Sequence, residues 1–291
     1  MIQYLYLGRV DYGEGLRLQA EVSALVGAGR LKNVLLLLEH PAVLTLGRNA
    51  NRANVLASDE FLAARGVTLH EINRGGDVTY HGPGQLVGYP IFALRSMKGP
   101  SGGRMGPVDF VRGMEEALIR LCAGFGVHAG RIAGMTGVWV GGPGIRDQGS
   151  GISDPSEEAP SHDAGALVAE RKIGAIGIHV ARGVTSHGFA FNVTTDLRDF
   201  DLIVPCGIRD HAVTSLEREA VAGVELPGLE AVADAAARQF GMVFGEHVLA
   251  VESVDALRVM AARGFPAEDT PVRVPAEVER LLGGAERPVQ S

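Results

Sequence analysis

Short apolar segments bounded by glycine, proline or asparagine recur along most of this 291-residue chain, and they constrain its fold more than any other feature. Each segment is too short for an ordinary helix, and several alternate between apolar and polar residues as strands do. Glycine supplies 40 of the residues, so many tight turns are expected between the strands. The predicted strands are Ile2–Leu7, Val34–Glu39, Val43–Leu46, Val67–Ile72, Leu86–Phe92, Val138–Val140, Ile173–Val180 and Gly188–Val193.

Helical spacing is present in fewer places. Asp109 can cap a helix that continues to Phe125, because apolar residues recur there at steps of three and four. The segments Glu14–Val26, Leu229–Phe244 and Ala250–Arg263 have a similar pattern. Strands outnumber helices and do not alternate regularly with them. The sequence therefore predicts an α/β (α+β) fold with a mixed β-sheet flanked by helices.

The domain organisation follows from length and composition. Residues 1–245 are expected to form one catalytic-sized domain. A loop insertion is predicted at about 141–165, where glycine, serine, proline and acidic residues show no periodicity. Residues 246–291 contain too few apolar residues for a domain of their own, so we interpret them as a C-terminal extension.

Charge and hydropathy exclude several classes of function. A formal net charge of −7 does not favour a nucleic-acid partner, because neutralising phosphates requires a basic face. The longest apolar run, Val34–Leu38, is far shorter than the roughly 18 residues that a membrane-spanning helix needs. No membrane association and a cytoplasmic location are therefore expected. With two cysteines, no CxxC pair and no HExxH motif, a metal site is not expected either.

The two cysteines lie in different settings. Cys122 falls on the apolar face of a predicted helix, where a cysteine acts as a small buried hydrophobe. Cys206 lies between Pro205 and Gly207, which break regular structure and permit close approach of another backbone. That setting suits a loop nucleophile. A cysteine that merely fills space in a tight turn is the alternative.

Lysine is scarce. Only Lys32, Lys98 and Lys172 are lysines among the 27 basic residues. Arginine does not release its proton in proteins, whereas a desolvated lysine can. Any ammonium group that transfers a proton must therefore belong to one of these three residues.

Arg74–Gln85 is the densest cluster of special residues in the chain. Four glycines remove side chains from this short stretch, while arginine, threonine, tyrosine, histidine and glutamine supply polar groups. The combination suits a backbone clamp around a polar head group, and a glycine-rich turn with a core tyrosine is the alternative. In the apolar strand Arg171–His179, Gly174 and Gly177 leave room for something to lie alongside. Lys172 lies at the entrance of that space or points into it.

Together these segments resemble the octanoyltransferase family of lipoate biosynthesis. Arg74–Gln85 matches the RGGxxTYHGPGQ signature of the family without a gap, and Lys172–Gly177 matches its KIAxxG strand. Residues 183–193 match the SxHGxAxNV strand, and Val204–Ile208 matches the PCG loop. The resemblance runs from about Leu5 to Phe244. The insertion and the C-terminal extension depart from the family pattern.

The resemblance implies the fold of the biotin/lipoate protein ligase catalytic domain and a two-step acyl transfer without a cofactor. Octanoyl would pass from the thioester of octanoyl-acyl carrier protein to Cys206, and then to the ε-amine of an acceptor lysine. Lys172 would act as general acid and base. The acceptors implied are lipoyl domains of 2-oxoacid dehydrogenase E2 subunits and the glycine cleavage H protein. The substrate-binding positions implied are Arg74, Gly75, Gly76, Asp77, Val78, Thr79, Tyr80, His81, Ala175, Ile176, Gly177, Gly188, Phe189 and Ala190.

Two other functions are compatible with parts of the same sequence. An ATP-dependent lipoate- or biotin-protein ligase would share the fold, and Leu46–Asn49 resembles a ligase segment. Such ligases activate a free acid as an adenylate and need no cysteine nucleophile, so the Cys206 loop favours the transferase. A binding or regulatory relative without turnover is the other alternative. The presence of both Cys206 and Lys172 argues against it.

Overall fold

The computed structural model describes residues 1–142, 169–205, 211–221 and 225–264. Cys206 and nearly all of the predicted insertion at 141–165 lie outside these ranges. The elements in chain order are β1 (Ile2–Arg9), α1 (Tyr12–Gly27), β2 (Asn33–Glu39), β3 (Val43–Leu46), η1 (Arg52–Asn54), α2 (Asp59–Ala64), β4 (Thr68–Glu71), β5 (Val78–His81), β6 (Gln85–Ile91), η2 (Leu94–Ser96), α3 (Pro107–Gly124), β7 (Ala129–Ile132), β8 (Met135–Val140), β9 (Arg171–Ala181), β10 (Val184–Asn192), η3 (Leu197–Leu202), β11 (Ala212–Val213), α4 (Leu216–Glu219), α5 (Leu229–Phe244), β12 (Val248–Ala250) and α6 (Val254–Arg263).

A large mixed sheet forms the centre of the molecule. Within the described residues its strand order is β12-β1-β2-β6-β10-β9-β8-β7, and β11 pairs with β9. The pairs of β1 with β2, β1 with β12, and β11 with β9 are parallel, and the remaining pairs are antiparallel. A second sheet, with the order β4-β3-β5, lies beside it. The predicted mixed sheet is confirmed.

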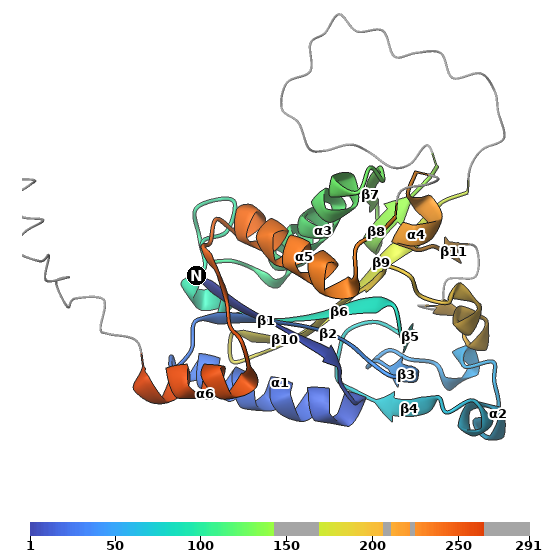
Figure 1. Cartoon of the computed structure of the whole chain (residues 1–291), viewed down its shortest axis with the longest axis horizontal. Coiled ribbons are helices and arrows are strands. Elements are labelled where there is room, and N and C mark those ends of the chain that lie inside the picture. The colour runs from blue at the N-terminus through green and yellow to red at the C-terminus, as the bar shows by residue number, and fades with distance from the viewer. Residues whose placement is uncertain (143–168, 206–210, 222–224, 265–291) are drawn as a thin grey trace, which may run out of the picture.

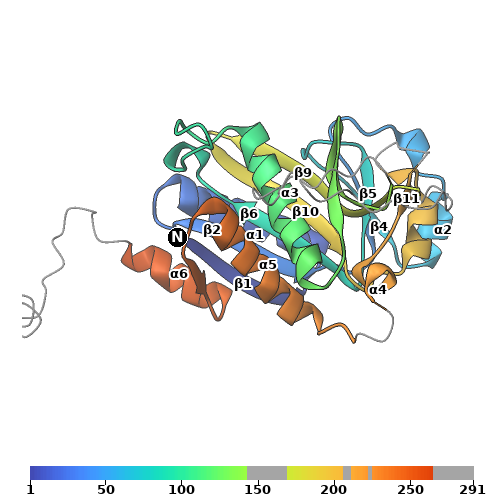
Figure 2. The same ribbon diagram turned by 90° about the horizontal axis from the view of Figure 1, so that it is seen from above.

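Helices cover both faces of the large sheet. Helices α3 and α5 lie over one face, and α1 and α6 lie over the other (Figures 1 and 2). The run Val34–Leu38 explains why both faces need cover, since Leu35 and Leu37 join the core under α3 and α5. Leu36 and Leu38 join the core under α1. A strand buried on both faces is continuously apolar, as β2 is.

The observed helices refine the predicted boundaries. Helix α3 begins at Pro107 after Gly106, two residues before the predicted cap at Asp109. Proline suits a first helical position because its missing N–H would have no helical partner there. Asp109 lies in the first turn instead, where a carboxylate interacts favourably with the helix dipole. In the part of the chain that the structure describes, no helix has both the length and the apolar character needed to span a membrane.

The described part of the predicted extension packs on the large sheet. Strand β12 lies parallel to β1, with Val248 opposite Ile2. Helix α6 buries Leu257 and Ala261 in the core that α1 also covers. Residues 246–264 therefore supply an edge strand of the large sheet and part of the helical cover on one face.

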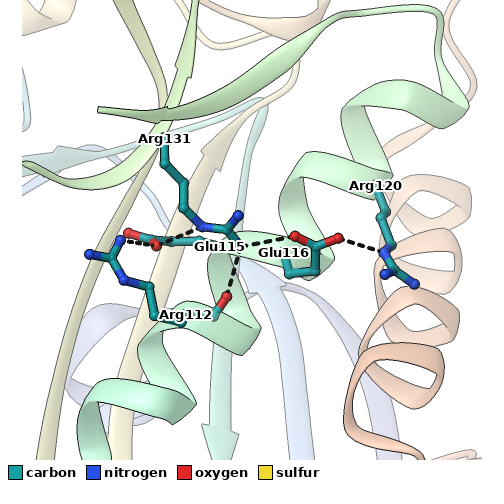
Figure 3. A network of polar contacts seen from close by, with 5 residues as sticks. All are labelled: Arg112, Glu115, Glu116, Arg120 and Arg131. Atoms are coloured by element: carbon teal, nitrogen blue, oxygen red, sulfur yellow. Dashed lines mark hydrogen bonds and ion pairs between the residues drawn. The ribbon is translucent and has the colours of Figure 1, made fainter. Parts of the chain in front are cut away.

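A network of charged side chains fastens α3 to the strands at the other end of the sheet (Figure 3). Arg112 and Arg131 both donate to Glu115 Oε2, at 2.7 and 3.1 Å. Arg131 also donates to Glu116 Oε2 at 2.9 Å, and Arg120 donates to Glu116 Oε1 at 2.8 Å. Arg131 belongs to β7, so the network joins a helix to a strand.

Glu115 is the buried centre of this network. Its side chain is fully buried, and its second oxygen, Oε1, accepts a hydrogen bond from the N–H of Gly137 in β8 at 3.0 Å. Removal of this carboxylate would leave the buried N–H of Gly137 without its acceptor and would take from Arg131 one of its two carboxylate partners. A buried charge or donor that loses its partner is far more costly than an exposed one.

We expect Glu115→Ala to lower the free energy of unfolding by about 3 kcal/mol, because it breaks a buried ion pair. Arg120→Ala removes an exposed arm of the same network and should cost less than about 0.5 kcal/mol. Urea unfolding followed by circular dichroism measures both values. Equal effects of the two substitutions would contradict the central role of Glu115.

Candidate active site

One cleft contains most of the residues that the sequence predicted for substrate binding. It lies between the loop that precedes β5, the hairpin formed by β9 and β10, and the start of α1, and it has a volume of about 500 Å³ including the part that opens to solvent. The side chains and backbone that line it come from Tyr12, Arg74, Gly75, Gly76, Asp77, Thr79, His81, Val87, Tyr89, Ala175, Ile176, Gly177, His187, Gly188, Phe189 and Ala190.

Val78 and Tyr80 are the two predicted binding residues that do not line this cleft. Side chains alternate along β5, so Thr79 and His81 face the cleft while Val78 and Tyr80 face the opposite way. There they join the core of the small sheet, where the Tyr80 hydroxyl donates to Asp199 at 2.6 Å. Tyr80 therefore fits the alternative interpretation of a core tyrosine, whereas Thr79 and His81 of the same strand lie where the predicted clamp requires them.

The clamp loop lies directly against β9. The N–H of Gly75 donates to the carbonyl of Ile178 at 3.1 Å. A Cβ atom at Gly177 would lie 2.7 Å from the carbonyl oxygen of Gly75, which is closer than real Cβ contacts come. Glycine at 177 is therefore what allows the loop and the strand to meet and form one wall.

Arg74 brings a buried cation to this wall. Its guanidinium donates to the carbonyl oxygen of Thr45 at 2.8 Å and to the hydroxyl of the same residue at 3.0 Å. A third bond joins it to the carbonyl of Gly75 at 3.0 Å. These bonds hold the guanidinium in one orientation beside the cleft, and its charge acts on the neighbouring histidines.

Two histidines near this wall, His81 and His40, are kept neutral by burial. Burial lowers the pKa of His81 to about 3, and its Nδ1 donates to Gln85 Oε1 at 2.8 Å. Burial also lowers the pKa of His40 to about 4. His40 Nδ1 donates to the carbonyl of Val10 at 2.6 Å, and its Nε2 accepts a hydrogen bond from Tyr89 at 2.7 Å. These two imidazoles are therefore uncharged at neutral pH, and His81 lies near the Arg74 guanidinium.

Four residues of the cleft were not among the predicted binding positions. Val87 and Tyr89 share one face of β6, and period-two spacing within the predicted strand Leu86–Phe92 is the signal that could have paired them. His187 lies within residues 183–193, which match the SxHGxAxNV strand, but the resemblance implies no binding role for it. Tyr12 comes from the first turn of α1, and nothing in its local sequence indicates a site.

Lys172 lines a smaller cavity that shares the walls of the cleft. Thr79, Ala175 and Ala190 border both spaces. Lys172 is 9% exposed, and its ammonium lies 4.5 Å from the ring centroid of Trp139, within the range of a cation–π contact. The lysine is thus inside the protein, next to the predicted acyl site.

An irregularity in the sheet gives Lys172 this position. Lys172 and Ala175 are three residues apart, so in a regular strand they would face opposite sides. The register between β8 and β9 shifts at this point, because Val138 pairs with Gly174 whereas the next residue, Trp139, pairs with Lys172. This shift brings Lys172 and Ala175 to one cavity. Ile173, between them, is fully buried in the main core.

Cys122 lies where the sequence predicts, on the buried face of a helix. Cys122 is fully buried on α3 in the main core, and burial raises the pKa of its thiol far above the ordinary value. Cys206 lies outside the described residues. Its neighbour Pro205 is described, and Pro205 borders the same cavity as Lys172.

Comparison with known proteins places this fold and these motifs in a family. Residues 11–241 match the model of the lipoyl protein ligase A/B catalytic domain. An octanoyltransferase of Acidobacterium capsulatum is 58% identical over 87% of this chain and 94% of its own length. An octanoyltransferase of Koribacter versatilis is 46% identical over 97% of both chains.

Solved structures agree on the fold. A lipoate-protein ligase A bound with ATP has a TM-score of 0.59 at 15% identity, covering 90% of this chain and 94% of its own. A bipartite lipoate protein ligase from Thermoplasma acidophilum also has a TM-score of 0.59, at 16% identity and with 90% and 91% covered. At such identities the likeness concerns the fold alone. The chain therefore belongs to the lipoyl protein ligase A/B catalytic-domain family, within its octanoyltransferase group, and is an acyltransferase.

Proposed function

We propose that this acyltransferase moves an octanoyl group from octanoyl-acyl carrier protein to the ε-amine of a lysine on lipoyl domains, through a thioester on Cys206. The observation that carries the proposal is the buried Lys172 in a cavity bordered by Pro205, the residue before Cys206. Octanoyl transfer in protein lipoylation agrees with the names of the curated relatives. The acceptors we propose are the lipoyl domains of E2 subunits and the glycine cleavage H protein.

In the first half-reaction the Cys206 thiolate attacks the carbonyl carbon of the carrier thioester. A new C–S bond forms, the bond to the carrier sulfur breaks, and the leaving thiolate takes a proton from the Lys172 ammonium. A free thiol is mostly protonated at neutral pH, so a nearby ammonium is needed to favour the thiolate. The charge of Lys172 and the low polarity of its cavity support this role.

In the second half-reaction the neutral amine of the acceptor lysine attacks the Cys206 thioester. An amide bond forms, the C–S bond breaks, and the proton lost by the attacking nitrogen passes to the neutral Lys172. The products are the octanoylated acceptor, the Cys206 thiolate and the Lys172 ammonium, so the starting state is restored. No ATP enters either step, which separates this reaction from that of an adenylate-forming ligase.

The cleft supports an acyl group in this orientation. Glycines at four of the wall positions remove side chains from its sides, and Val87, Phe189 and Ala190 add apolar surface. Each buried methylene contributes about 0.8 kcal/mol, so an eight-carbon chain gains affinity from such a wall. The carbonyl end would lie toward Lys172, where Thr79, Ala175 and Ala190 join the cleft to its cavity.

The proposed nucleophile is tested by intact-mass measurement of the protein mixed with octanoyl-carrier protein in the absence of ATP. We expect an acyl adduct that Cys206→Ser abolishes and Cys122→Ala retains, because Cys122 is buried with a raised thiol pKa. Free octanoate with ATP should produce no adduct. Transfer to a lipoyl domain that needs ATP would identify the protein as a ligase instead.

The role of Lys172 is tested by measuring the two half-reactions separately with rapid quenching. Lys172→Arg keeps a positive charge but removes the proton-accepting group, so the second half-reaction should slow by about a hundredfold and the first by much less. Lys172→Ala should slow both and raise the pH at which Cys206 is alkylated. Lys98→Arg, at an exposed lysine, is the matched control. Small and equal effects of both Lys172 substitutions would contradict the proposed acid–base role.

A further inference from the structure

His187 is the residue that the acyl cleft shares with a second, larger hollow. This groove runs between α1 and the far end of the β9–β10 hairpin and has a volume of about 1420 Å³ including space open to solvent. Small and apolar residues such as Leu16, Ala20 and Val184 line it together with polar ones, among them Gln19 and Arg182. No other described residue borders both the cleft and the groove.

The structure holds His187 firmly in this position. Its backbone N–H donates to Gln19 Oε1 of α1 at 2.8 Å, and its ring Nε2 donates to Asn73 Oδ1 at 2.7 Å. The side chain is 5% exposed. Its backbone has a φ of 57°, a left-handed conformation that costs a residue other than glycine about 1 kcal/mol. Contacts from α1 and from the segment before the clamp thus keep the ring between the two spaces.

The ring is also suited to contact with an apolar chain end. Burial, and then the charges of Arg74 and His179, lower the pKa of His187 to about 4. The imidazole is therefore neutral at physiological pH, so an alkyl group beside it meets an uncharged ring, while the Arg74 cation lies in the wall of the same cleft.

The distance along the sheet fits a medium-length chain. Ala190 borders both the cleft and the Lys172 cavity, and His187 lies three residues away on the same strand. Three residues of an extended strand span about 10 Å, which is comparable with the reach of an extended eight-carbon chain. A chain with four more carbons would meet the imidazole and its hydrogen-bonded neighbours.

We propose that His187 closes the inner end of the acyl cleft and so sets the upper limit on the length of the acyl chain. This inference rests on the proposed function, in which the acyl carbonyl lies at the Lys172 end of the cleft. Beyond His187 the groove, which has apolar residues of α1 and β10 in its wall, offers room into which a longer chain can extend once the ring is removed. The limit on length thus depends on one side chain, which is held by a hydrogen bond from its ring to Asn73 and by one from its backbone N–H to Gln19.

The test compares the full-length protein with His187→Gly, using octanoyl-, dodecanoyl- and tetradecanoyl-carrier protein as donors and an apo lipoyl domain as acceptor. Glycine accepts the left-handed backbone at this position and removes the ring. We expect the ratio of dodecanoyl to octanoyl transfer to rise by about tenfold or more, since a closed pocket end is lost. Acyl adducts measured by intact mass should lengthen in parallel.

Arg182→Gly is the matched control. Arg182 is the other non-glycine residue with a positive φ, 53°, and it is exposed at the hairpin turn. Arg182 borders the groove but not the cleft, so glycine there relieves the same kind of backbone strain and leaves the end of the cleft intact. Its ratio of dodecanoyl to octanoyl transfer should stay within about twofold of the unaltered protein.

A second variant guards against loss of folding. His187→Asn keeps a residue that tolerates the left-handed backbone but shortens the side chain, so it should extend the accepted chain by fewer carbons than glycine does. If the folded variants transfer octanoyl but accept no longer chains, His187 is not the end wall. If the unaltered protein transfers no acyl group from any carrier, the proposed function itself fails. The two failures are therefore distinguishable.

Discussion

The close contact between the clamp loop and β9 is the interaction on which the site depends. Gly75 and Ile178 share a backbone hydrogen bond, and Gly177 carries no side chain that would separate the two segments. Because backbone meets backbone there, Arg74 is brought to the wall of the cleft instead of to the protein surface. The large sheet supplies the rigid base, since its apolar strands are buried between helices on both faces.

Charge is distributed unevenly around the cleft, and burial is the main cause. His40, His81 and His187 have lowered pKa values because their charged forms would lose solvation. Arg74 is held in the wall of the cleft by hydrogen bonds to Thr45, and Lys172 lies over Trp139 in the adjoining cavity. The cleft therefore combines uncharged imidazoles with a guanidinium. In the proposed reaction the acyl carbonyl lies toward Lys172.

The three hollows of the site follow one another along β10. Ala190 borders the Lys172 cavity and the cleft, and His187 borders the cleft and the groove beside α1. The sequence order of Ala190 and His187 in β10 is therefore also the spatial order of the Lys172 cavity, the cleft and the groove. Chemistry is proposed at one end and chain-length selection at the other, with the glycine-lined wall between them.

Local sequence patterns determined eight of the described strands, the principal helices and the candidate chemistry of this protein, but they did not predict β5, β7, β11 or β12. A continuous apolar run such as Val34–Leu38 predicts a buried strand, because the side chains on both faces of such a strand pack against other elements. The clamp motif and Lys172 were recognisable from residue type and spacing. Only the tertiary structure decided which of these residues meet. The register shift beside Trp139 turns Lys172 toward Ala175, and strand alternation sends Val78 and Tyr80 into a core. His187 becomes a wall because α1 and Asn73, distant in the chain, bind it there. Such outcomes depend on contacts between remote segments, whose geometry no local pattern encodes.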